Sequence, residues 1–106
     1  LPKLEKQRKY NSLLVAQIIK LCILTIQQHF PLWKNLYSKI EKQLKRSGYV
    51  DSDIPSICFK AGELACQGGN AVEGQLLFEI SKSQYTQCGN FEELQKLEKI
   101  IEIYQP

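Results

Sequence analysis

The segment Cys66–Leu77 reads CQGGNAVEGQLL, and the segment Cys88–Leu97 reads CGNFEELQKL. Both contain Gly-Asn-x-x-Glu directly before a run that holds leucines. Asn70 and Asn90 suit a helix N-cap, because the short side-chain oxygen can accept from the free N–H groups of the first turn. The glutamate three residues later can bond back to the cap and lies beside the positive end of the helix dipole. The preceding glycines suit the end of another helix. Each segment therefore predicts a helix end, a tight turn and a helix start.

Apolar residues at helical spacing extend this pattern over the whole chain. Pro31 ends the first predicted helix, and Gly48 ends the second. The predicted helices are Leu4–His29, Leu32–Ser47, a third that begins near Asp53 and ends near Cys66, Ala71–Gln87, and Phe91–Tyr104. No segment alternates with period two for long enough to predict a strand. We predict an all-α fold of about five helices stacked as antiparallel hairpins, as in a helical-hairpin repeat or in a helical bundle.

Small residues recur in the C-terminal half where two antiparallel helices would approach closely, with one aromatic residue between them. The positions are Gly62, Gly69, Gly74, Phe78 and Ser81. This pattern resembles the tetratricopeptide repeat, a 34-residue helix-turn-helix unit. It departs from that family where Cys58, Ala61, Ala65 and Thr86 replace large residues or proline. The segment Tyr85–Leu94 (YTQCGNFEEL) is also similar to the turn of a pentatricopeptide repeat. Each resemblance covers less than a quarter of the chain. The resemblances imply stacked helical hairpins, and they assign no residue of this chain to ligand binding.

The chain has 106 residues, which favours a single helical domain over residues 1–106. It contains no methionine and starts at Leu1, so we expect it to be part of a larger protein. Residues 1–50 hold ten Lys and Arg against two Glu, a net charge of +8, whereas residues 51–106 hold four Lys against nine Asp and Glu, a net charge of −5. This asymmetry favours either basic helices that pack beside acidic ones or a nucleic-acid-binding half.

The cysteines and the single histidine do not form a recognisable reactive pattern. Cys22, Cys58, Cys66 and Cys88 include no C-x-x-C pair, and His29 is distant from all of them in sequence. Zinc sites usually show close ligand pairs, so we expect no metal ion. The cysteines lie on predicted apolar faces, and we expect no catalytic residue and no cofactor. We predict four reduced, buried thiols and an intracellular location, in the cytoplasm or nucleus. The glycine-rich GGNAVEG lacks the Lys-Ser/Thr of a phosphate-binding loop.

The apolar run Leu13–Ile26 follows a basic stretch and superficially resembles a signal peptide. Gln17 and Lys20 interrupt it, and it is shorter than the roughly 20 residues of a membrane span. We therefore predict a buried helix and no membrane partner.

The first and the last helix carry apolar stripes wider than one neighbouring helix can cover. The predicted partner-binding residues are Leu14, Ile18, Ile19 and Ile23 in the first helix, and Ile100, Ile103 and Tyr104 in the last. An exposed apolar patch usually marks an interface. The expected function is non-catalytic binding of another protein, as a scaffold or adaptor, or formation of a homodimer. No small-molecule substrate is expected.

A nucleic acid, most simply RNA, is the alternative partner. The candidate contacts are Lys34, Lys39, Lys42, Lys45 and Arg46, which recur about every three residues in the second helix. Such an array can contact several phosphates and gives salt-dependent binding, and Tyr37 and Tyr49 could stack on bases. The competing interpretation is that these cations stay hydrated and favour the helix dipole.

Overall fold

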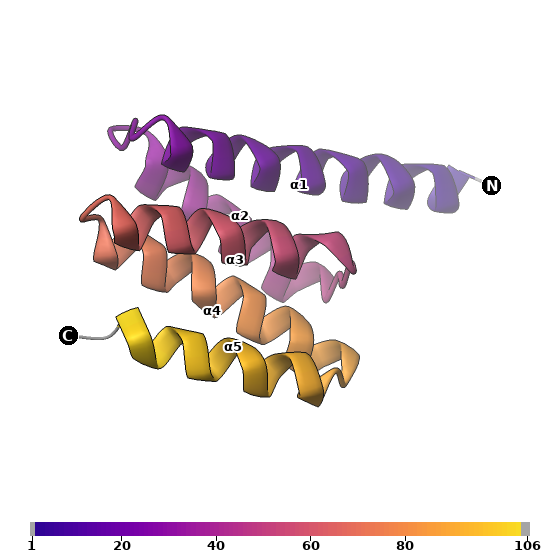
Figure 1. Ribbon diagram of the computed structural model, residues 1–106. Helices are drawn as coiled ribbons and strands as arrows, with labels where there is room; N and C mark the ends of the chain where they lie inside the picture. The colour runs from indigo at the N-terminus through magenta and orange to yellow at the C-terminus, as the bar shows by residue number, and fades with distance from the viewer. Residues whose placement is uncertain (1, 105–106) are drawn as a thin grey trace.

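The computed structural model describes the backbone of residues 2–104 and the side chains of residues 8–104. The described residues form five helices: α1 (Pro2–Ile26), α2 (Trp33–Ser47), α3 (Asp53–Gln67), α4 (Ala71–Cys88) and α5 (Phe91–Tyr104). Consecutive helices run in opposite directions, and the stack begins with α1 and ends with α5 (Figure 1). The extents of 49 × 34 × 17 Å describe a flat slab. The predicted all-α class is confirmed.

The two Gly-Asn turns form where the sequence predicts them. Gly69 and Gly89 adopt φ values of +87° and +74°, which only glycine adopts without strain. The N–H of Asn70 then bonds to the Ala65 carbonyl at 2.7 Å, and the N–H of Asn90 to the Tyr85 carbonyl at 3.0 Å. These bonds satisfy carbonyls that the end of each helix would otherwise leave free.

The predicted side-chain caps are realised at one turn. Asn90 Oδ1 accepts from the N–H of Glu93 at 3.4 Å, whereas Asn70 makes no side-chain cap bond at the start of α4. The Glu93 carboxylate pairs with Lys96 Nζ at 3.4 Å. The first helix also ends at Ile26 rather than at His29, because Gln28 takes a left-handed φ of +56°.

Helices α3 and α4 approach each other closely at two glycines. A Cβ atom added at Gly62 would lie 2.7 Å from a ring carbon of Phe78, and one added at Gly74 would lie 2.8 Å from the Gly62 carbonyl oxygen. Ser81 Oγ donates to the Pro55 carbonyl at 2.8 Å across the same contact. The predicted close approach is confirmed for Gly62, Gly74, Ser81 and Phe78, which is 0% exposed, and is wrong for Gly69, which lies in the turn with no atom near the position of a Cβ.

The larger core lies between α1, α2, α3 and α4 and centres on Trp33. The Trp33 indole N–H donates to Thr25 Oγ1 at 2.7 Å, and the Thr25 hydroxyl donates to the Leu21 carbonyl at 2.8 Å. These two bonds satisfy the indole N–H of Trp33 and the hydroxyl of Thr25, which are both buried.

Gln84 fixes the connection between α2 and α3. Its buried amide donates to the Tyr49 carbonyl at 2.9 Å and accepts from the N–H of Asp51 at 3.0 Å. Asp51 Oδ1 in turn accepts from the N–H of Asp53 at 2.7 Å, at the start of α3. A loop 33 to 35 residues away in sequence is thus anchored to α4.

Candidate functional site

Two of the predicted binding residues lie in an exposed apolar row on the outward face of α1. Ile19 and Ile23 are 41% and 47% exposed, in agreement with the expectation that they face outward. Ile26, at 59%, and Ala16 lie on the same face. Their spacing places all four on one side of the helix. We call these four residues the α1 ridge.

The expected exposure of Leu14 and Ile18 is wrong. Both are 1% exposed and belong to the core with Trp33 and Ile54. The physical reason is that α1 packs against both α2 and α3 along one face. Leu14 and Ile18 lie on that face, whereas the ridge lies about half a turn away.

The three candidates of α5 fall into two environments. Ile103 is 76% exposed. Tyr104 is partly buried: its hydroxyl donates to Glu63 Oε2 at 3.2 Å and accepts from Gln67 Nε2 at 3.1 Å, and its ring lies 6.1 Å from that of Phe78. Ile100 is half-buried and lines a small cavity with Phe59 and Tyr85. The expectation of a free stripe is therefore wrong for Ile100 and Tyr104, which attach α5 to the stack.

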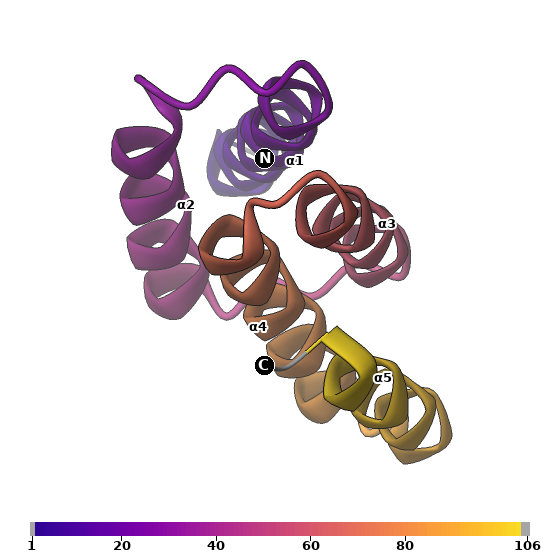
Figure 2. The same cartoon turned by 60° about the vertical axis from the view of Figure 1, so that its left-hand side comes forward.

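The stack also separates the two predicted binding helices. Figure 2, a view from another side, shows α1 and α5 at opposite ends, with α3 and α4 between them. The seven candidate residues consequently do not form one surface. The prediction from the sequence did not include Ile26 and Ala16, although their spacing from Ile19 and Ile23 is visible there.

The basic residues of α2 all reach solvent. Lys39, Lys42 and Arg46 form one row at helical spacing, and within the described side chains none of the three makes an ion pair. Lys45 Nζ pairs with Glu41 at 3.4 Å, on the flank of the helix that it shares with Lys34. All five predicted cations are exposed, but only Lys39, Lys42 and Arg46 share one row.

The tyrosines expected to stack on bases are engaged inside the protein. The Tyr37 ring stacks on Trp33, with ring centres 5.3 Å apart and planes inclined by 4°. Burial, followed by the hydrogen bond to Glu41, raises the pKa of the Tyr37 hydroxyl. The Tyr49 hydroxyl donates to Asp51 at 2.8 Å. The Tyr37 ring is therefore not a free aromatic platform, because Trp33 covers one of its faces.

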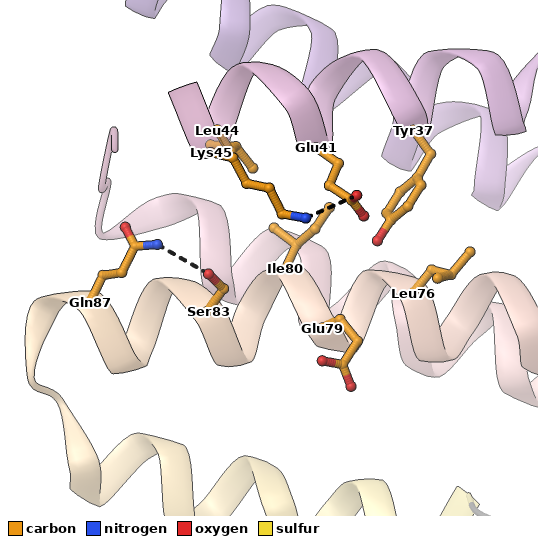
Figure 3. A pocket seen from close by; sticks show the side chains of 9 residues that line it. All are labelled: Tyr37, Glu41, Leu44, Lys45, Leu76, Glu79, Ile80, Ser83 and Gln87. Atoms are coloured by element: carbon orange, nitrogen blue, oxygen red, sulfur yellow. Dashed lines mark hydrogen bonds and ion pairs between the residues drawn. The ribbon is translucent and has the colours of Figure 1, made fainter. Parts of the chain in front are cut away.

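A groove of about 350 Å³ separates α2 from α4 (Figure 3). Its apolar part is formed by Leu44, Leu76 and Ile80, with the Tyr37 ring on the α2 side. The Lys45–Glu41 pair lies along its α2 wall, and a Gln87–Ser83 hydrogen bond of 3.2 Å lies along its α4 wall. Four of the polar side chains that line the groove are therefore paired with each other. It contains neither histidine nor cysteine.

The cysteines occupy three kinds of environment, which corrects the prediction that all four are buried. Cys22 and Cys58 are buried together between α1 and α3, Cys66 is partly buried, and Cys88 is exposed at the end of α4. The hydrogen bond that the Cys58 thiol donates to Cys22, together with burial, raises the pKa of Cys58 well above its ordinary value. Burial raises the pKa of Cys66 as well.

No group of three or more His, Cys, Asp or Glu side chains in the described part of the chain is arranged to hold a metal ion. His29 is exposed just beyond α1, away from the buried Cys22–Cys58 pair. Within α1, residues Arg8–Ile26 have the length and apolar character of a membrane span, a property that core helices of soluble proteins share. Comparison of the chain with protein-family models, curated proteins and solved structures finds no match.

Proposed function

We propose that the protein is a non-catalytic binding module that contacts another protein through the α1 ridge. The observation that carries the proposal is the exposure of Ile19, Ile23 and Ile26 in one row on a helix whose opposite face is fully packed. Three large aliphatic side chains in one row make an apolar surface that folding leaves uncovered. The resemblance to helical-hairpin repeats supports the same role, and unpaired thiols support an intracellular setting.

The proposal is tested by site-specific photocrosslinking in the cells that produce the protein. A photoreactive amino acid replaces Ile23, and a matched variant carries it at Val72, which is 64% exposed on α4. We expect a discrete crosslinked protein from position 23 only, and its loss when Ile19→Glu is added. Equal crosslinking from both positions, or crosslinking that survives Ile19→Glu, would contradict the proposal.

Nucleic-acid binding is the second candidate, favoured by the exposed row of Lys39, Lys42 and Arg46. Each phosphate contact releases counterions, so binding through three cations should weaken with a slope of about −2 in log K against log salt for a single strand. The test is titration of generic single-stranded RNA with the native protein and with Lys42→Glu. Binding that is absent at low salt, or unchanged in the variant, removes this candidate.

A further inference from the structure

The α1 ridge extends a seam with alternating spacings of four and three residues. Ser12, Ala16, Ile19, Ile23 and Ile26 follow this order, and all five are exposed. Alternation of three and four is the spacing of the a and d positions in a coiled coil, where each side chain inserts between four residues of one facing helix. The seam covers about 21 Å at 1.5 Å per residue. Its width and spacing match one further helix.

The charges that α1 itself places beside this seam are all positive, whereas Asp51 of the α2–α3 connection lines a shallow pocket with Arg8 and Ser12. Arg8 and Lys20 occupy flanking positions, Lys9 continues the seam toward the N-terminus, and all three are exposed. From Arg8 to Ile26, α1 contains no acidic residue. In a coiled coil, residues beside the seam pair with charges on the facing helix and decide which partner is accepted. The complement of this surface is a helix with acidic flanks.

The same charges argue against a second copy of this chain as the occupant. A parallel pairing of α1 with α1 of another copy would bring Arg8, Lys9 and Lys20 close to their own counterparts, and an antiparallel pairing centred on the seam would still bring Lys20 close to its own counterpart. The acidic α5 is no better, since its outward row reads Phe91, Gln95, Glu98 and Glu102, with one apolar residue. A membrane surface would meet Leu13 besides the three isoleucines, which is still a small apolar area, and interfacial binding scales with the apolar area that is buried.

We propose that α1 docks a single amphipathic helix of another protein, one with aliphatic residues along its seam and acidic residues beside it. This inference rests on the proposed function, because it names the partner class for the same ridge. The isoleucines supply the apolar contact, and Arg8, Lys9 and Lys20 select for the acidic flanks. Charges at the rim of an interface act mainly on partner choice and association rate.

The test uses two designed helical peptides of 21 residues with identical leucine seams. One carries glutamate at every e and g position, the other lysine, and binding of each labelled peptide is followed by fluorescence anisotropy. We expect the glutamate peptide to bind at least about tenfold more tightly than the lysine peptide, with affinity that falls as salt rises. Ile23→Glu should weaken binding more than about tenfold, as for a central apolar contact. Val72→Glu, a matched change on α4, should leave the affinity unchanged.

A charge-reversed variant tests the selection itself. Lys20→Glu should reduce the preference for the glutamate peptide and improve binding of the lysine peptide. Equal binding of both peptides by the native protein, or no binding of either, overturns the inference. Binding to vesicles of phosphatidylcholine and phosphatidylserine without peptide binding overturns it in favour of a membrane. A specific crosslink at position 23 in cells, without selection between peptides, leaves the proposed function intact and rejects only this partner class.

Discussion

Phe78 and two glycines, Gly62 on α3 and Gly74 on α4, set how closely these two helices pack. The Phe78 ring occupies the position that a side chain at Gly62 would need, and it also lies 5.9 Å from the Phe59 ring. Contacts of this kind are lost outright when the ring is removed, because the surrounding backbone cannot collapse fully into the space.

Phe78→Ala should lower the free energy of unfolding by about 3–5 kcal/mol, the usual range for a buried aromatic residue. Urea denaturation measures the change. Phe91→Ala provides the control, because it removes the same side chain from an exposed site on α5 and should cost less than about 1 kcal/mol. A cost at Phe78 as small as that of the control would show that the ring is not a core contact.

The four thiols should differ in reactivity according to their surroundings. In the native protein, an aromatic disulfide reagent should modify Cys88 first and Cys66 more slowly, because burial and a raised pKa keep the Cys66 thiol protonated at neutral pH. Raising the pH should accelerate the reaction of Cys66 as its thiolate becomes populated. Cys22 and Cys58 should react only after unfolding.

Denaturant without reductant should release four thiols in total. The loss of two would reveal a disulfide and would argue against the intracellular setting. Rapid modification of Cys58 in the folded protein would contradict its enclosure between α1 and α3.

Helix α1 presents two apolar faces with different roles. One face holds Leu14 and Ile18 against the Trp33 core, and the other carries the ridge. The sequence predicts the helix but cannot separate its faces, because α1 is apolar nearly all round. The positions of α2 and α3 decide which residues are covered.

Substitution of neighbouring residues distinguishes the two faces. Ile18→Glu places a carboxylate in the core and should unfold the domain, whereas Ile19→Glu adds a charge on the surface and should change stability by less than about 1 kcal/mol. Circular dichroism during thermal unfolding measures both. Unfolding of Ile19→Glu would mean that the ridge is covered within the monomer.

Across the molecule, signals local in sequence were sufficient to predict the helices and insufficient to predict which of their residues lie on the surface. The turns at Gly69 and Gly89 depend on neighbouring residues alone, and so the helices were predictable to within a few residues. The burial of Ile100 and Tyr104 depends on Phe59, Phe78 and Glu63, which lie far away in sequence. The exposure of Ile19 likewise depends on where α2 and α3 pack against α1, which neighbouring residues in the sequence do not determine.

The close contact between α3 and α4 also has a consequence for the order of folding. These helices are joined by a short turn, and their interface is the most extensive in the stack, whereas α5 packs mainly on α4. Contacts that are local in sequence form early because little chain entropy is lost in closing them. We therefore expect the α3–α4 hairpin to be the nucleus, with α5 joining after the rate-limiting barrier.

Stopped-flow chevrons of two core variants test this order. Phe78→Ala should mainly slow refolding, with a φ value above about 0.5, whereas Leu97→Ala in α5 should mainly speed unfolding, with a φ value below about 0.3. The opposite assignment would place the nucleus in α4 and α5. If the expected order holds, α5 can detach and reattach while α3 and α4 remain paired, and its amide hydrogens should exchange with solvent faster than theirs.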